Sequence, residues 1–132
     1  MTTVTIQDDV TTRTGRAPLQ FTLDFPMTQI TVRELIRSRV TGEVNDYNMN
    51  QPAYFQGLVR PTGAETTQDG YRVARGRVID PQRQEEQALA AFGANGFMVL
   101  VDDRQVDDLD EIITLREHSV ITFLKLIPLV GG

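Results

Sequence analysis

Alternating apolar and polar residues mark the first two extended segments of the chain. Val4 and Ile6 alternate with polar neighbours, and residues 19–25 place an apolar side chain at every second position. A period of two residues is typical of a strand with one buried face. Gly15 and Pro18, two residues that favour turns, lie between the two segments. The pattern therefore predicts a β-hairpin.

A helical pattern follows the hairpin. Thr31 and Glu34 have the spacing of a capping box, in which side chains bind the free N–H groups at a helix start. Ile30 and Leu35, on either side, have the spacing of a hydrophobic staple. Gly42 is expected to end the helix. The apolar stripe at helical spacing consists of Val32, Leu35, Ile36 and Val40.

The middle of the chain has weaker patterns. Residues 53–62 and 71–79 are predicted to form the strands of an arm around the turn-rich sequence PTGAETTQDG. A short second helix is predicted after the arm, with Asp80 as its cap, Pro81 in its first turn and Gly93 at its end. The apolar residues of this second helix that share one face are Ala88, Leu89 and Phe92.

The last third of the chain returns to clear patterns. The apolar residues 97–101 predict a central strand, bounded by Asp102-Asp103, and residues 104–106 predict a brief returning strand. Residues 112–115 are predicted to form a short helical turn with an apolar side, and residues 120–126 a final strand. A hairpin followed by a helix and further strands predicts an α+β fold, with a mixed sheet and one main helix packed on it.

Composition narrows the classes of protein that fit this pattern. A length of 132 residues with 40% hydrophobic residues suits one globular domain. The sequence has no long apolar run and no secretory signal, so we expect a cytoplasmic protein that does not bind a membrane. A net charge of −5 without a basic cluster argues against a nucleic-acid partner. The absence of cysteine excludes disulfides and thiol chemistry.

No side chain stands out as a catalytic group or metal ligand. Residues 102–111 contain six acidic residues but lack the glycine of a calcium loop, so they predict a solvated acidic loop or a surface for a basic partner. His118 is expected in an exposed turn. Arg33 and Arg37, with Arg39 nearby, are expected on a solvated helix face.

The order of these elements resembles the β-grasp fold of ubiquitin and of the small sulfur carriers of molybdopterin and thiamine synthesis. Residues 101–106 (VDDRQV) resemble ubiquitin's turn and short strand. Residues 115–123 (LREHSVITF) and 127–132 (IPLVGG) resemble the last strand and the Gly-Gly tail of the sulfur carriers. The resemblance implies one ubiquitin-like β-grasp domain over residues 1–132, with an insertion at about 43–95 that holds the second helix.

The resemblance also implies that the tail is the working part of the chain. The Gly132 carboxylate would be adenylated by an E1-like (ThiF/MoeB-like) enzyme, which consumes ATP. Gly131 and Gly132 lack side chains and so suit a narrow catalytic channel. Pro128 stiffens the base of the tail, which continues through Leu129 and Val130.

A docking surface is expected beside the tail. If Ile121 and Phe123 face the core, the alternate residues of the last strand face outward. Ubiquitin is recognised through an apolar patch on this strand, so the resemblance implies a docking role here; the alternative is that the insertion covers these residues as core. The outward residues are Val120, Thr122, Leu124 and Leu126.

Three functions fit the resemblance. The first is a protein modifier of a bacterial or archaeal conjugation system, joined through Gly132 to an amine on a target protein. The second is a sulfur carrier that forms a thiocarboxylate, and the third is a non-covalent binding or scaffold module. None of them makes the chain an enzyme or gives it a bound cofactor. An E2-like enzyme, a JAMM-type peptidase and self-assembly through the insertion are left open. The single lysine, Lys125, favours single modification or head-to-tail stacking over branched chains.

Overall fold

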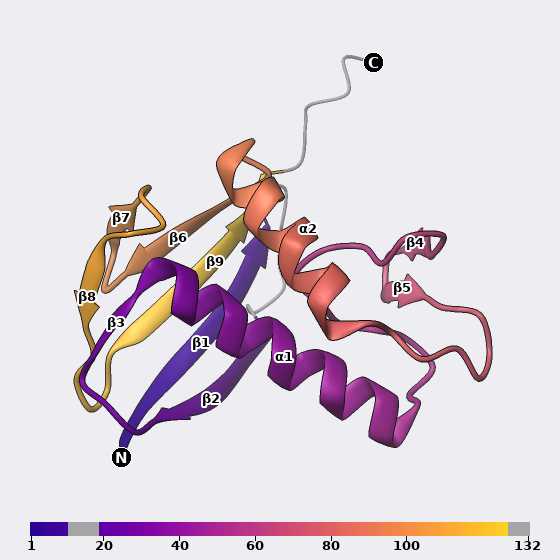
Figure 1. The fold of residues 1–132 in the computed structure, drawn as a ribbon, viewed down its shortest axis with the longest axis horizontal. Helices are drawn as coiled ribbons and strands as arrows, with labels where there is room; N and C mark the ends of the chain where they lie inside the picture. Colours follow the sequence, from indigo (N-terminus) through magenta and orange to yellow (C-terminus); the bar gives the residue numbers. More distant parts are fainter. Residues whose placement is uncertain (11–18, 127–132) are drawn as a thin grey trace. The chain divides into compact units, whose positions relative to one another are not determined.

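The computed structural model describes residues 1–10 and 19–126 (Figure 1). Contacts divide the chain into two compact units. The sheet unit combines Met1–Glu34 with Phe92–Gly132, and the helix unit consists of Leu35–Ala91. The fold of the described residues is α+β, with a mixed sheet and two helices.

The sheet unit contains a five-stranded mixed sheet (Figure 1). Strands β1 and β9, the first and last of the sheet along the sequence, are neighbours and run parallel to each other. Every other neighbouring pair in the sheet is antiparallel. The predicted hairpin, the apolar strand, the brief returning strand and the final strand are all confirmed. In spatial order the strands are β2 (Leu19–Phe25), β1 (Thr2–Val10), β9 (Val120–Lys125), β6 (Phe97–Val101) and β7 (Arg104–Val106).

Burial along the sheet follows the period of two residues. Ile6 lies opposite Ile121, and Val99 lies opposite Phe123; all four side chains are fully buried. The pattern is weaker on β2, where Leu19 is 48% exposed although it belongs to the same apolar alternation. This difference arises because β2 is an edge strand and has a neighbour on one side only.

A tight turn joins β6 to β7. Its central residues, Asp102 and Asp103, have φ values of 47° and 70°. Two successive positive φ angles are typical of a type I′ turn, whose twist suits a two-residue hairpin. Asp102 also binds the start of β9, because its backbone N–H donates to the Val120 carbonyl and its carboxylate accepts from the Val120 N–H, both at 2.9 Å.

A second, two-stranded sheet pairs β3 (Gln29–Thr31) with β8 (Ile112–Thr114). The helical turn predicted for residues 112–115 is therefore wrong. Ile112 is 63% exposed and Ile113 is 1% exposed, which is the alternation of a strand. Two adjacent isoleucines fit either structure, and pairing with Gln29–Thr31 determines the outcome.

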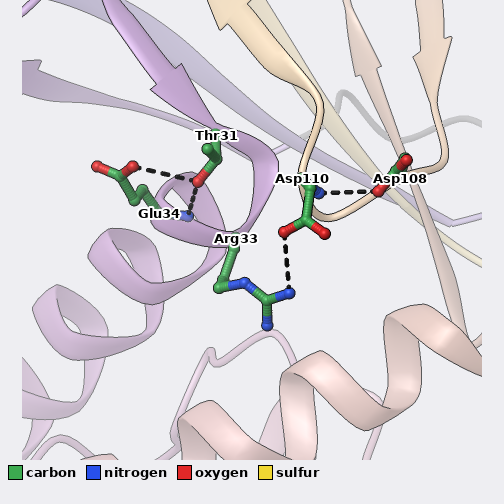
Figure 2. A network of polar contacts seen from close by, with 5 residues as sticks. All are labelled: Thr31, Arg33, Glu34, Asp108 and Asp110. Atoms are coloured by element: carbon green, nitrogen blue, oxygen red, sulfur yellow. Dashed lines mark hydrogen bonds and ion pairs between the residues drawn. The ribbon is translucent and has the colours of Figure 1, made fainter.

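The first helix, α1 (Val32–Asn50), begins at the predicted cap. Figure 2 shows Thr31 and Glu34 pointing toward each other. The Thr31 hydroxyl oxygen accepts the Glu34 backbone N–H at 3.1 Å, and the hydroxyl lies 3.2 Å from the Glu34 carboxylate, to which it donates. The N-cap is thus confirmed, and it satisfies one of the N–H groups that a helix start leaves free.

The loop between β7 and β8 provides acceptors for two more of the free N–H groups at the start of α1. The Val32 N–H donates to the Glu111 carbonyl, and the Arg33 N–H donates to the Leu109 carbonyl, each at 3.0 Å. The Arg33 guanidinium also binds the Asp110 carboxylate at 3.2 Å (Figure 2). The acidic loop therefore contributes backbone carbonyls to the cap of α1.

Replacing Thr31 by alanine is expected to lower the free energy of unfolding by about 1 kcal/mol, because the Glu34 N–H loses its acceptor. Urea denaturation followed by circular dichroism measures this loss. Thr31→Ser keeps the hydroxyl and should retain most of the stability; equal losses in both variants would contradict a role for the hydrogen bond.

The predicted end of the helix at Gly42 is wrong. A glycine inside a helix costs about 1 kcal/mol relative to alanine. The helix continues because Val44 and Tyr47 extend the apolar stripe, and both are buried. It ends where Gln51 adopts a positive φ of 46° and donates its N–H to the Tyr47 carbonyl at 2.7 Å, just before Pro52.

The helix unit contains a short hairpin in place of the predicted long arm. Strands β4 (Glu65–Thr67) and β5 (Gly70–Arg72) are each three residues long and lie within or next to the stretch expected to be a turn. The strands predicted for residues 53–62 and 71–79 are thus largely wrong, since the first segment has only an isolated bridge, from Phe55 to Tyr71, and the second contributes only Tyr71 and Arg72 to β5. Gly57 and Pro61 interrupt the first of these segments.

Aromatic side chains form part of the core of the helix unit. The ring of Phe55 lies 5.4 Å from that of Tyr47, in an edge-to-face arrangement, and 6.5 Å from that of Tyr71. Burial raises the pKa of the Tyr71 phenol above its usual value.

The second helix, α2 (Pro81–Gly93), has the predicted bounds. The Asp80 carboxylate accepts the Gln82 N–H at 3.0 Å, which confirms the cap. Ala88 and Phe92 are buried and Leu89 is half-buried, as one apolar face requires. Of the helices in the described residues, none combines the length and apolarity that crossing a bilayer requires.

Candidate functional site

The strand β9 carries the described part of the predicted site. It lies between β1 and β6, and its core-facing residues, Ile121 and Phe123, are fully buried. The alternate residues Val120, Thr122 and Leu124 are half-buried and belong to the opposite face of the sheet. The predicted orientation of the strand is therefore confirmed.

Neighbouring strands extend this opposite face. On β6, Met98 lies opposite Leu124 and Leu100 lies opposite Thr122. Both residues of β6 are also half-buried. We call the five residues Val120, Thr122, Leu124, Met98 and Leu100 the outward face. Four of them are apolar, so a part of this surface is suited to contact another apolar surface.

Polar residues border the outward face on the other side of β9. On β1, Thr5 lies opposite Val120 and Gln7 lies opposite Thr122. Gln7 accepts a hydrogen bond from Gln20 of β2 at 2.9 Å. The apolar part of the face is thus confined to β9 and β6, with a hydrogen-bonded polar border along β1 and β2.

Of the remaining predicted site residues, only Leu126 lies within the described part of the chain. Leu126 is half-buried, and its N–H donates to the Gly96 carbonyl at 3.3 Å, which extends the ladder beyond β9. The tail residues predicted to donate the acyl group or to support it lie outside the described residues. These are Pro128, Leu129, Val130, Gly131 and Gly132.

The acidic loop is exposed, but several of its carboxylates have structural partners. Asp108 accepts the Asp110 N–H at 2.9 Å, and Asp110 binds Arg33. Glu111 lies 2.8 Å from the Arg104 guanidinium. Asp103 and Asp107 form no hydrogen bond or ion pair with any residue that the structure describes. The solvated loop is confirmed, and its part in binding a basic partner stays a prediction.

His118 and its neighbourhood offer no catalytic arrangement among the described residues. His118 is exposed in a turn with a φ of 71°, as predicted. The adjacent Ser119 is buried, and its hydroxyl accepts the Arg116 N–H at 3.0 Å. In residues 1–10 and 19–126, no three acidic or histidine side chains gather closely enough to hold a metal ion.

Arg39 does not lie on the solvated helix face that was predicted for it. Its side chain is 1% exposed and forms an ion pair with Glu43 at 3.2 Å, whereas Arg33 and Arg37 bind the carboxylates of Asp110 and Glu85. Arg39 and Glu43 are four residues apart on the helix, a spacing that favours such a pair. That spacing beside the apolar stripe was the available signal for a buried charge.

Glu43 connects α1 to the segment that follows it. Its second carboxylate oxygen accepts the Leu58 N–H at 2.9 Å. Near the other end of α1, the Asn48 side chain donates to the Ile79 carbonyl and accepts the Ile79 N–H, both at 2.8 Å. Side chains of α1 therefore fix two irregular segments of the helix unit through their backbone groups.

The chain matches no protein-family profile, no curated protein and no solved structure.

Proposed function

We propose that the chain is a ubiquitin-like protein modifier with a β-grasp fold, joined through its Gly132 carboxylate to an amine on a target protein. The observation that carries this proposal is the strand order β2-β1-β9-β6-β7, in which β1 and β9 are parallel neighbours. The β-grasp resemblance implies a hairpin that leads to a helix and a closing strand that leads to the tail. Here α1 follows the hairpin, and the predicted tail follows β9.

In this proposal the chain supplies an acyl group, and its partners supply the catalytic side chains. The Gly132 carboxylate attacks the α-phosphate of ATP on an E1-like enzyme, which forms an acyl-adenylate and releases pyrophosphate. An enzyme thiolate then displaces AMP to give a thioester. An amine of the target finally displaces the thiolate and forms an amide bond. Glycine at 131 and 132 removes the side chains that would obstruct entry to the active site.

The outward face gives the activating enzyme a place to dock in this proposal. Leu124 and Val120 lie on the strand that leads directly toward the tail. An apolar contact at the outward face would therefore bring the tail close to the enzyme that binds it. In this proposal residues of about 43–95 are the insertion, and they include the last turns of α1 as well as β4, β5 and α2.

The chain offers one side-chain amine for modification of its own copies. Lys125 is half-buried at the end of β9, and it has a partner in the structure. The chain also has twelve arginines. Their guanidinium groups stay protonated in proteins and therefore do not attack the thioester as an amine does. Branched chains through lysine are therefore disfavoured.

A tagged chain expressed in its natural host tests the proposal. We expect adducts of higher mass that survive boiling and reductant. Because Lys125 is the last basic residue, trypsin should leave residues 126–132 attached to the modified amine of the target. Deletion of Gly132 is expected to abolish the adducts. Gly42→Ala, at a glycine with open space around its Cβ position, is the matched control and should keep them.

A sulfur carrier is the second candidate, and the similarity of residues 127–132 to the sulfur carriers' tail favours it. The acyl-adenylate would be the same, but sulfide would displace AMP and leave a thiocarboxylate. The intact mass would then rise by the difference between one sulfur and one oxygen, without protein adducts. If neither the adducts nor the thiocarboxylate forms, and deletion of Gly132 has no effect on function, the chain is a non-covalent binding module instead.

A further inference from the structure

An open pocket of about 510 Å³ lies in the helix unit, beside the β4–β5 hairpin. It contains two guanidinium groups, one carboxylate and one phenol, and small side chains form much of its remaining wall. Its lining residues are Ala53, Tyr54, Gly63, Glu65, Arg72, Val73, Ala74 and Arg75.

Arg72 is held in place by its neighbours. Its guanidinium lies 3.4 Å from the Glu65 carboxylate on the paired strand β4. It also donates to the Tyr54 hydroxyl at 3.3 Å and lies 5.7 Å from the centroid of the Tyr54 ring. The positive charge of Arg72 is thus positioned and partly balanced within the pocket.

Arg75 differs from Arg72 because its charge is not balanced. Its side chain is exposed and forms no hydrogen bond or ion pair within the described part of the chain. Arg77 places a third guanidinium near the pocket, because its Nη1 lies 3.7 Å from the position that a Cβ on Gly63 would occupy. The part of the pocket around Gly63 and Arg75 is therefore positive, although the whole chain carries a net charge of −5.

We propose that this pocket binds the carboxylate of an acidic peptide segment on a partner protein, through a bidentate contact with the Arg75 guanidinium. A planar guanidinium presents two parallel N–H donors that match the two oxygens of a carboxylate. The site is independent of the tail and of the outward face.

Two features favour a peptide carboxylate over a phosphate group. Glu65 already places one negative charge in the pocket, which penalises a dianion more than a monoanion. The Glu65 carboxylate can also accept an N–H of the bound peptide backbone. Ala53, Gly63 and Ala74 leave room for the peptide main chain beside these groups.

Nuclear magnetic resonance of the full, ¹⁵N-labelled chain tests the proposal with the probe acetyl-Gly-Gly-Glu-Gly-Gly-amide. As the peptide concentration rises, the chemical shifts of the Arg75 side-chain N–H and of the backbone N–H groups of Gly63 and Ala74 are expected to change until they reach a plateau. The same peptide with glutamine in place of glutamate should give none. Arg75→Gln is expected to weaken binding by about tenfold or more, because a charge-assisted bidentate contact is lost.

Arg83→Gln is the matched control, since Arg83 is exposed on α2 and forms no ion pair with a described residue. It should bind the glutamate peptide as the unchanged chain does. Equal melting temperatures of the two variants would show that both are folded. Equal shifts with the glutamine peptide, or unchanged affinity in Arg75→Gln, would overturn the site. Tighter binding of a phosphoserine peptide would overturn its assignment to a carboxylate.

Discussion

Phe123→Ala is expected to lower the free energy of unfolding by about 3–5 kcal/mol, the usual range when a fully buried phenylalanine is truncated. Phe123 is 0% exposed on β9, and its ring lies 6.1 Å from that of Phe97. Because β9 has neighbours on both sides, the sheet has little freedom to close the resulting cavity. Equilibrium denaturation in guanidinium chloride measures the change.

Thr122→Ala is the matched control for this prediction. Thr122 is adjacent on the same strand, but it is half-buried and belongs to the outward face. Its replacement should cost less than about 1 kcal/mol, mostly through lower strand propensity. Similar losses at both positions would show that the core does not lie on the Phe123 side of the sheet.

Glu43→Gln is expected to cost about 3 kcal/mol of folding free energy. The substitution keeps the shape and the acceptor for the Leu58 N–H, but it leaves the buried Arg39 guanidinium without the negative charge of Glu43. Removing one partner of a buried ion pair is strongly destabilising because the other charge stays out of water. Thermal unfolding and urea denaturation both report this loss.

Glu65→Gln makes the same chemical change at an exposed ion pair. The side chains of Glu65 and its partner Arg72 are 65% and 55% exposed, and solvent screens their attraction. The expected loss is below about 1 kcal/mol. If the two glutamine variants are equally stable, burial of Arg39 does not have the energetic role that we assign to it.

Elements set by local chemistry were predictable from the sequence. Thr31 begins α1 because a hydroxyl at that position can bind a free N–H, whatever the rest of the chain does. Asp80 acts in the same way before α2. Asp102 and Asp103 separate β6 from β7 because aspartate tolerates a positive φ.

Elements set by distant partners were not predictable. Ile112 and Ile113 form a strand because Gln29–Thr31 pairs with them, and neither segment's pattern identifies the other. Gly42 lies inside a helix because Val44 and Tyr47 are buried, a tertiary effect that outweighs local propensity.

The candidate site was predictable to different degrees. The alternation of β9 correctly separated Ile121 and Phe123 from the outward residues, because side chains of a strand alternate between its faces. The pocket beside Arg75 has no such signal. It depends on three segments of the helix unit meeting in space, which no spacing in the sequence encodes.

The parallel pairing of β1 with β9 has a consequence for how the protein is made. Thr5 finds its partner, Val120, only after the more than one hundred residues between them have left the ribosome. Until then the side of β1 that β9 will occupy is an unprotected edge, open to association with other nascent chains. Closure over so long a sequence separation also slows the formation of the sheet. Synthesis should therefore be followed by a slow, chaperone-sensitive maturation step, and stalled or truncated chains should aggregate.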